Sequence, residues 1–390
     1  MTELLAEKHP TVRVEAVRIV EHAQCGDGVA STADRVKLEL EYSLGCDAGL
    51  PDEIVLKTIL LHPYLRFGLP MILGLSNTLN RLDSIPLLGK LIRPLVFTMV
   101  NLYQRFFPHA PEAMYANETH FYCDIRPELD IEAPAAYGGV FEKETGHFGV
   151  LMEDLSLREA RFPNALSEIS MEEMQSLMKQ LASLHARFWE SPRLEGDLSW
   201  VPTTSKGGMF PVFDAIGLDV IRDQVRKNAF KQELIAPLNR SIDDMWADVW
   251  KAQALFDQGP ITLLHGDTHM GNTYLLPGGK GGFLDWQLMV KGSWAHDFTY
   301  LVCTGLATET RRKHERELLT LYLDELRRHG VENPPSQEEA WLRHRQAAIW
   351  GLVIGWLITP PANYGQEITA ANIQRMVAAV QDLETFKALS

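Results

Sequence analysis

Four side chains that can bind a metal ion or move a proton lie within residues 265–272. The stretch LLHGDTHMGNT holds His265, Asp267, His269 and Asn272, and the following run GGFLDWQ adds Asp285. Apolar residues flank both stretches, so the polar groups are expected at the ends of short buried strands. These residue types allow three alternatives: a metal-dependent hydrolase, a phosphotransferase, or no catalysis at this place.

A hydrolase would use the alternation His265-x-Asp267-x-His269 to place three metal ligands on one face of a strand. A hydrolytic zinc site usually draws further histidines from other loops. The remaining histidines of this chain are scattered and form no second cluster. The sequence therefore disfavours a zinc hydrolase.

A phosphotransferase needs one carboxylate to take the proton of the acceptor hydroxyl and oxygen ligands to hold Mg²⁺ against the phosphates. Asp267 and Asn272 are separated by four residues, and Asp285 follows after the turn sequence PGGKGG. A hairpin of TYLL and FLDWQ across this turn would return Asp285 to the side of Asn272. Two oxygen ligands would then converge, with Asp267 close to both.

The first part of the chain predicts strands. RVKLELEY at 35–42 alternates strictly between apolar and charged residues, and it lies between the strand-like runs at 12–22 and 53–60. A helix is expected over 113–122, followed by a hairpin formed by 136–142 and 148–153. Lys57 is the single charge inside the apolar part of the 53–60 run.

The later part predicts helices. Met174, Leu177, Leu181, Leu184 and Phe188 are spaced three and four residues apart, which is typical of an amphipathic helix over 172–189. Further helical patterns cover roughly 209–257, 308–329, 337–358 and 367–388. The outline is an α+β protein with a β-rich first part and a mainly helical second part.

The motif HGDTHMGN followed by FLDWQ resembles the catalytic segment of the aminoglycoside phosphotransferase and choline kinase superfamily. The DWQ ending, LHARFW at 184–189 and HDFTYLV at 296–302 are most similar to the ecdysteroid kinase-like branch and its bacterial relatives. The resemblance covers roughly 12–60 and 112–300. It implies a protein kinase-like fold with an N-lobe at 1–154 and a C-lobe at 155–390 that carries the catalytic loop and the acceptor site.

The resemblance also implies roles for individual residues in an ATP- and Mg²⁺-dependent kinase. Asp267 matches the catalytic base, and Asn272 and Asp285 match the Mg²⁺ ligands. Lys57 matches the lysine that contacts the phosphates, and Glu118 matches the acid that pairs with this lysine.

Two further segments match the nucleotide site of this superfamily. The loop CGDGVAST stands where a loop covers the phosphates, with Gly26, Gly28 and Ser31 as the expected contacts. The segment around Met152 and Asp154 stands where main-chain groups hold the adenine. The loop fits a G-x-G-x-x-G pattern poorly, so turn formation alone is the alternative role of its glycines.

The chain departs from the superfamily between Lys57 and Glu118, where residues 61–111 read as a helical insertion into the N-lobe. The insertion is rich in apolar residues, but its uncharged run at 67–80 is too short to span a membrane. A packed helical pair, a lid and an apolar surface that contacts a membrane or ligand are the alternatives. We expect the insertion to form one wall of an apolar acceptor site.

Residues around the motif have expected supporting roles. His265 is expected to brace the loop through backbone hydrogen bonds, and Asp297 is expected to cap the next helix and hold the catalytic loop. His185 is expected to be a core histidine with satisfied hydrogen bonds, and the role of His269 stays open between structure and substrate contact. The late aromatic residues are either an acceptor pocket or core: Trp341, Trp350, Trp356 and Tyr364.

Composition limits the partners. The chain has 390 residues and a net charge of −14, which argues against nucleic acid. Four widely spaced cysteines without a CxxC pair and an N-terminus without an apolar run predict a cytoplasmic protein. We expect a monomer or homodimer that acts on a small-molecule hydroxyl acceptor. The alternative is a catalytically silent, nucleotide-binding regulatory protein of the same fold.

Overall fold

The computed structural model describes residues 1–6, 8–23, 33–43, 49–60, 112–142, 147–210 and 213–390. The loop with Gly26, Gly28 and Ser31 and the insertion at 61–111 lie outside these residues. The chain divides into two compact units. The first comprises Met1–Glu128, Pro134–Arg158 and Pro211–Ile216, and the second comprises Leu129–Ala133, Glu159–Phe210 and Gly217–Ser390.

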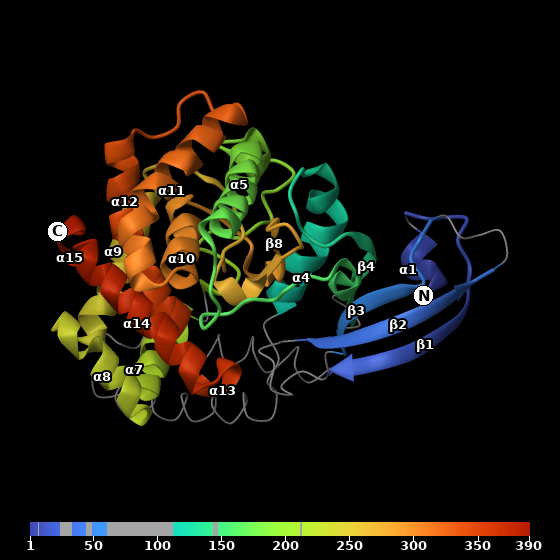
Figure 1. The fold of residues 1–390 in the computed structure, drawn as a ribbon, viewed down its shortest axis with the longest axis horizontal. Coiled ribbons are helices and arrows are strands. Elements are labelled where there is room, and N and C mark those ends of the chain that lie inside the picture. The colour runs from blue at the N-terminus through green and yellow to red at the C-terminus, as the bar shows by residue number, and fades with distance from the viewer. Residues whose placement is uncertain (7, 24–32, 44–48, 61–111, 143–146, 211–212) are drawn as a thin grey trace. The chain divides into compact units, whose positions relative to one another are not determined.

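The first unit is built on an antiparallel sheet of five strands in the order β1-β2-β3-β5-β4 (Figure 1). The strands are β1 (Val14–Ala23), β2 (Asp34–Tyr42), β3 (Glu53–Leu60), β4 (Ala136–Glu142) and β5 (His147–Glu153). The predicted alternation along β2 is confirmed, because Val36, Leu38 and Leu40 are buried. They pack in one cluster with Ile54 and Leu151 of the neighbouring strands.

Two α-helices lie among the described residues of this unit. Helix α1 (Thr2–Ala6) contacts β4, and helix α4 (Glu112–His120) contacts β4 and β5. The helix predicted over 113–122 is confirmed, and its end passes into a π-helical turn at Phe121–Ile125. Because α4 lies against the sheet, its Tyr115 is fully buried and its ring lies 4.9 Å from that of Phe148 on β5.

The second unit is mainly helical, so the predicted α+β class is confirmed. Helix α5 (Met171–Phe188) begins with a capping box formed by Ser170 and Glu173 and buries the five apolar residues that predicted it. The remaining helices are α7 (Leu218–Lys227), α8 (Ala229–Ile235), α9 (Ile242–Phe256), α10 (Ala295–Gly305), α11 (Thr308–Arg328), α12 (Gln337–Trp350), α13 (Pro361–Tyr364), α14 (Gln366–Asp382) and α15 (Thr385–Ala388).

The helical region expected over 209–257 is divided into separate helices. Asn228 has an extended backbone and separates α7 from α8. After α8, Pro237 lies in a short 3₁₀ turn, and Asn239 has a left-handed backbone that ends it. Helix α9 then restarts from the cap Ser241. Periodicity predicted the helical character of this stretch, but local breakers set its boundaries.

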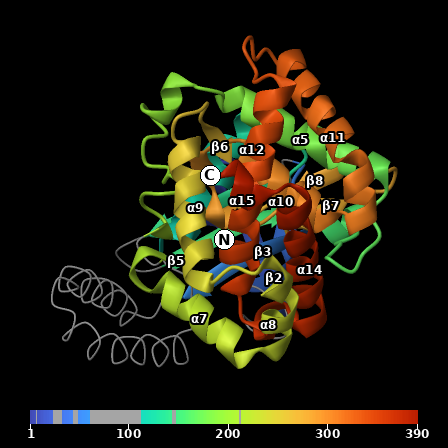
Figure 2. The same ribbon diagram turned by 90° about the vertical axis from the view of Figure 1, so that its left-hand side faces the viewer.

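Helix α10 is the central helix of the second unit, because every one of its residues is buried. Its neighbours include α5, α12 and α14. Helix α12 in turn contacts α9 and α15 as well as α10 (Figure 2). It continues into a π-helical segment at Gly351–Leu357. Gly355 is required there, because a Cβ atom would lie 2.6 Å from the hydroxyl of Tyr300 on α10.

Four short strands carry the motif. Strand β6 (Thr262–Leu264) pairs with β9 (Val290–Gly292), and β7 (Thr273–Leu275) pairs with β8 (Gly281–Phe283). The hairpin expected from TYLL and FLDWQ is confirmed, with Thr273 opposite Phe283, but β8 begins at Gly281, inside the predicted turn. The loop that carries Asp267 and Asn272 therefore runs from the end of β6 to the start of β7, and Asp285 follows the end of β8.

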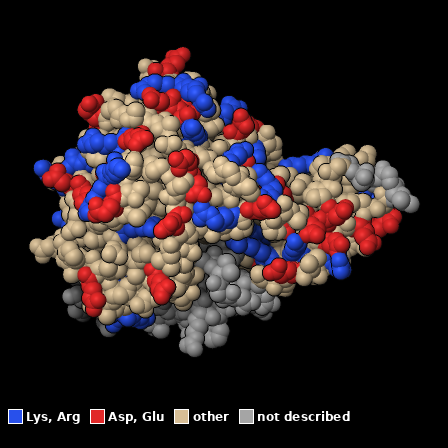
Figure 3. Space-filling view, viewed as in Figure 1, with Lys and Arg blue, Asp and Glu red and all other residues tan. Residues whose placement is uncertain are grey.

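The surface of the second unit carries both charge signs. On the face shown in Figure 3, Lys and Arg are interspersed with Asp and Glu, and the described residues there show no continuous basic field. Within the described ranges, no helix is both long enough and apolar enough to cross a bilayer.

Candidate active site

The loop between β6 and β7 turns through Gly266. This residue has a φ of +84°, and a Cβ atom there would lie 2.0 Å from the carbonyl oxygen of Leu288. Any other residue would both strain the backbone and collide with the neighbouring strand connection. Gly266 therefore lets the chain pass close to the segment after Asp285 and places Asp267 at the tip of the turn.

Asp267 and Asn272 are joined directly. The side-chain nitrogen of Asn272 donates to the carboxylate Oδ2 of Asp267 and to its backbone carbonyl, both at 2.9 Å. Because the amide nitrogen is used in this way, the amide oxygen is the atom of Asn272 that can bind a cation. The Asp267 side chain keeps 20% of its surface exposed, so it remains open to a substrate.

Asp285 lies beside this pair, as the hairpin predicted. The backbone N–H of Leu284 donates to the carbonyl of Asn272 at 3.0 Å, which extends the pairing of β7 and β8 by one residue. Asp285 itself has a left-handed backbone with a φ of +65°, an uncommon conformation for a non-glycine residue that is often found at functional sites.

The two carboxylates influence each other. Burial, together with the negative charge of Asp285, raises the pKa of Asp267 to about 8. A cation between the two groups would relieve this repulsion, because opposite charge favours the ionised form of a carboxyl group. The electrostatics thus suit a site that receives a proton or a metal ion.

His265 braces the loop, as expected. The backbone N–H of Asp267 donates to its Nδ1 at 3.2 Å, so the ring proton is on Nε2, which donates to the carbonyl of Leu284 at 3.0 Å. This fully buried ring therefore links the residue before Asp285 to Asp267.

Asp297 on α10 holds the other side of the turn. Its carboxylate accepts the backbone N–H of His265 at 2.7 Å and that of Gly266 at 2.9 Å. The expectation that Asp297 holds the loop is confirmed. The expectation that it caps the helix is wrong, because Trp294 is the N-cap and the Asp297 side chain bonds the loop instead.

His185 on α5 supports Asp297. Its Nε2 lies 3.2 Å from the carboxylate, and its Nδ1 lies 2.7 Å from the hydroxyl of Tyr322 on α11. All three side chains are buried. Burial alone would raise the pKa of Asp297, but the hydrogen bond to His185 and the neighbouring histidines outweigh it, so the pKa lies below its usual range. His185 is a satisfied core histidine, but it also fixes the carboxylate that holds the catalytic loop.

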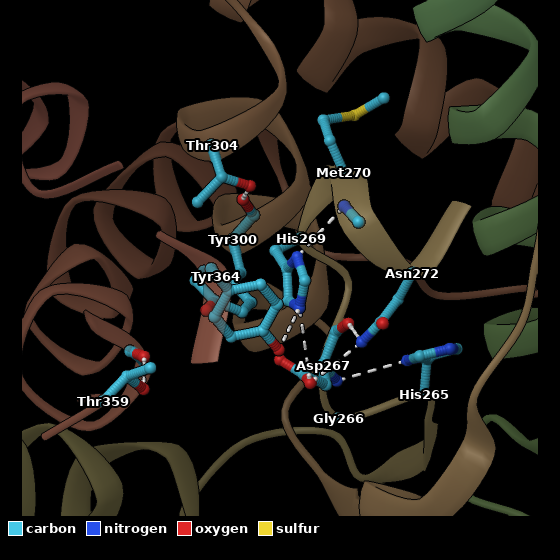
Figure 4. A network of polar contacts seen from close by, with 12 residues as sticks. His265, Gly266, Asp267, His269, Met270, Asn272, Tyr300, Thr304, Thr359 and Tyr364 are labelled. Atoms are coloured by element: carbon cyan, nitrogen blue, oxygen red, sulfur yellow. Dashed lines mark hydrogen bonds and ion pairs between the residues drawn. The ribbon is translucent and has the colours of Figure 1, made fainter. Parts of the chain in front are cut away.

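His269 begins the 3₁₀ turn Met270–Asn272 and accepts the backbone N–H of Gly271 on Nδ1 at 3.0 Å. Its Nε2 lies 3.7 Å from the Asp267 carboxylate and 3.5 Å from the hydroxyl of Tyr364 (Figure 4). The rings of Trp356 and Tyr364 each lie 5.5 Å from the imidazole in edge-on arrangements. Of the four late aromatic residues, these two therefore lie at the catalytic loop.

The other two late aromatic residues lie elsewhere. The Trp350 ring lies 4.0 Å from that of His296, whose Nε2 donates to the carbonyl of Gly266 at 3.1 Å. Trp341 stacks with the guanidinium of Arg316. Trp350 therefore packs against the histidine that holds the loop, and Trp341 belongs to a contact between α11 and α12.

Two residues of the first unit that were expected to act together are in contact. Lys57 Nζ on β3 donates to Glu118 Oε1 on α4 at 2.8 Å, across 61 residues of sequence. Both are buried, with 3% and 1% of their surfaces exposed. A buried lysine requires a partner, and the pairing predicted from the resemblance supplies it.

The segment expected at the adenine is the end of β5 and the residue after it. Met152 pairs with Val55 of β3 and Ala136 of β4. The Asp154 carboxylate pairs with Lys37 on β2 at 2.8 Å and accepts the backbone N–H of Ser156 at 2.9 Å. The Asp154 side chain thus shapes the end of this strand.

The zinc alternative finds no support in the geometry. His265 directs its ring nitrogens to Leu284 and Asp267, and His269 directs Nδ1 to Gly271. Over the described ranges, no group of three or more His, Cys, Asp and Glu side chains has the arrangement of a metal site.

Sequence reasoning missed Lys231 on α8. Its fully buried ammonium donates to the carbonyls of Trp356, Leu357 and Thr359 at 3.2, 3.0 and 2.6 Å. It thereby closes the end of the π-helical segment that carries Trp356. The stretch AFKQELI places Lys231 next to Gln232 and Glu233, so nothing in the sequence indicates that it is buried.

We expect stability to fall below neutral pH because of the buried histidines. Burial lowers the pKa of His265, His269, His296 and His344 below the ordinary 6.5, to about 4 for His269. Below pH 6.5 the unfolded chain binds protons that the folded chain does not, so the free energy of unfolding falls as pH drops towards 4.

Chemical denaturation between pH 7.5 and 5 measures this effect. Replacing His344 with glutamine removes one of these groups. The slope of the free energy of unfolding against pH should then decrease by at most the contribution of one bound proton. A free energy of unfolding that is constant over this range would contradict the prediction.

The chain is similar to one sequence family and to several solved structures. A sequence model described as the ecdysteroid kinase-like family matches residues 104–331, which is more than half of the chain. No curated protein sequence matches at a significant level.

Solved structures give weaker likenesses. A spectinomycin phosphotransferase in complex with ADP and spectinomycin is 10% identical, with a TM-score of 0.47, over 98% of this chain and 97% of its own. An ethanolamine kinase of Plasmodium vivax is 12% identical, with a TM-score of 0.43, over 97% and 84%. The choline kinase LicA of Streptococcus pneumoniae is 12% identical, with a TM-score of 0.41, over 97% and 98%.

Proposed function

Because this chain belongs to the ecdysteroid kinase-like family and is thus a phosphotransferase with an alcohol group as acceptor, we propose that it transfers the γ-phosphoryl group of ATP, with Mg²⁺, to the hydroxyl of a small molecule. The observation that carries the proposal is the joined pair Asp267–Asn272 with Asp285 next to it. This set offers one base and two oxygen ligands at a single place.

Asp267 is the proposed base. The alcohol oxygen forms a bond to the γ-phosphorus while its proton passes to the Asp267 carboxylate. The bond between the γ-phosphorus and the β,γ-bridging oxygen breaks, which leaves ADP. The raised pKa of Asp267 favours proton acceptance. Its bond to Asn272 fixes the orientation of the carboxylate.

Asn272 and Asp285 would hold Mg²⁺. An amide oxygen and a carboxylate are hard donors of the kind that Mg²⁺ prefers and zinc does not. Bound Mg²⁺ would offset the negative charge of the phosphates. Asn272 is held by its two bonds to Asp267, so its amide oxygen has a fixed direction.

In the first unit, Lys57 is the proposed phosphate contact and Glu118 the residue that orients it. The 2.8 Å ion pair between β3 and α4 supports these roles. We further propose that main-chain groups near Met152 and Asp154 contact the adenine. The proposed organisation is an N-lobe at 1–154 that binds nucleotide and a C-lobe at 155–390 that binds the acceptor.

The acceptor is proposed to be an alcohol on a largely apolar body. Trp356, Tyr364 and Tyr300 surround His269 next to the base. The rings of Trp356 and Tyr300 are buried and that of Tyr364 is partly exposed, so the surroundings of the base are apolar and uncharged on this side, which suits an uncharged alcohol.

Turnover with a panel of alcohols tests the proposal. The panel contains a hydroxysteroid, benzyl alcohol, glycerol, choline and ethanolamine, each with ATP, and the measurements are ADP release and a product heavier by one phosphoryl group. We expect turnover to require Mg²⁺ or Mn²⁺, to stop with EDTA and to return with either metal.

Two results would contradict the proposal. Stoichiometric zinc in protein purified without added metal would favour the hydrolase. A thermal shift with ATP and Mg²⁺, but no turnover with any alcohol or with water, would favour a silent nucleotide-binding protein.

A further inference from the structure

The ring of His269 is held in one protonation state by its backbone contact. The N–H of Gly271 can only donate, so the Nδ1 that receives it at 3.0 Å carries no proton. The ring is therefore neutral, and its proton is on Nε2. As the cap of the 3₁₀ turn, the ring has a fixed direction as well as a fixed tautomer.

The Nε2–H group faces the Asp267 carboxylate and the Tyr364 hydroxyl. It lies 3.7 Å from Asp267 Oδ2 and 3.5 Å from the Tyr364 hydroxyl, and both distances exceed the 2.7–3.2 Å of a well-formed N–H···O bond. The side chain is only 5% exposed. A buried donor with only long contacts is costly, so an oxygen atom that lies beside this pair, within hydrogen-bond distance of both Nε2 and the Asp267 carboxylate, would be bound favourably.

The surroundings prevent the ring from turning away. The ring of Trp356 meets the imidazole edge-on at 5.5 Å. The ring of Tyr364 does so at the same distance, and that of Tyr300 lies 6.1 Å away (Figure 4). Lys231 fixes the carbonyls of Trp356, Leu357 and Thr359, which anchors this wall to α8. The donor is thus part of a rigid arrangement.

We propose that His269 is a further catalytic residue, whose Nε2–H donates to the hydroxyl oxygen of the acceptor alcohol. The assignment rests on the kinase function proposed above. With its oxygen held by His269, the alcohol can direct its own O–H to Asp267, which lies within reach of the same point. His269 thereby positions the acceptor oxygen and orients the lone pair that attacks.

Two substitutions separate this role from the capping role. In His269→Asn, the side-chain oxygen takes the place of Nδ1 and can still accept from Gly271, but nothing reaches the place of Nε2. In His269→Gln, the side-chain nitrogen reaches the place of Nε2, while the cap is lost. Asparagine is a strong N-cap and glutamine is not.

The assay uses the panel alcohol with the highest wild-type turnover, with ATP and Mg²⁺. His269→Asn should lower kcat/KM for the alcohol by about 10- to 100-fold, the usual effect of losing a single hydrogen bond to a buried group. His269→Gln should retain most of the activity. The KM for ATP and the unfolding temperature of His269→Asn should match those of the wild type.

The outcomes are distinguishable. If His269→Asn is as active as the wild type while His269→Gln is impaired, the ring serves only as a cap and the assignment falls. The same conclusion follows if ¹⁵N-histidine spectra of the wild type show the proton of His269 on Nδ1. If the wild type phosphorylates no alcohol, the proposed function falls, and this assignment falls with it.

Discussion

Replacing Asp267 with asparagine is expected to lower kcat by about 10²–10⁴, the usual contribution of a general base. The substitution preserves shape and can still accept the hydrogen bond of Asn272, but it removes proton acceptance. The KM for ATP should barely change, because the proposed nucleotide contacts are other residues. Steady-state kinetics with the best alcohol of the panel measures the loss.

A stability measurement on metal-free protein serves as the control. The raised pKa of Asp267 means that its ionisation costs stability as pH rises from the ordinary 3.8 towards about 8. Asparagine avoids this cost, so the variant should unfold at the same temperature as the wild type or higher, with a gap that widens with pH. Near-normal turnover by a folded Asp267→Asn protein would overturn the kinase mechanism.

Replacing Asp297 with alanine should impair both stability and catalysis. The change leaves two buried backbone N–H groups and the ring of His185 without their acceptor. The free energy of unfolding should fall by about 3–5 kcal/mol, as when one member of a buried charged pair is removed. The turn at Gly266 loses its anchor, so kcat should also fall at a temperature where the variant remains folded.

Asp248 on α9 provides a matched control. Its carboxylate is also buried and pairs with Arg240, away from the catalytic loop. Asp248→Ala should destabilise the protein yet keep the kcat of its folded fraction. If Asp297→Ala retained kcat in the same way, the carboxylate would serve stability alone.

Elements with strong local patterns were predictable from the sequence. Strand β2 alternates because one face is buried, and α5 has its capping box and a continuous apolar stripe. The proximity of Asp285 and Asn272 was also local, because a turn at 276–280 joins two short strands whose register leaves little freedom. The contact between Lys57 and Glu118 is different in kind, since 61 residues separate them and only the family resemblance predicted it.

The sequence by itself therefore determined the order of the elements and the chemical groups of the catalytic loop. Tertiary structure alone decided what holds and surrounds these groups. Packing of α5 and α11 against α10 brings His185 and Tyr322 to Asp297, and the π-helical segment after α12 brings Trp356 to His269. These contacts join residues about 90–140 positions apart, and no short-range pattern encodes such distances, because they depend on how whole helices pack. Lys231 shows the reason most clearly. Its three carbonyl acceptors lie more than 120 residues away, so only the folded chain can distinguish it from an ordinary surface lysine.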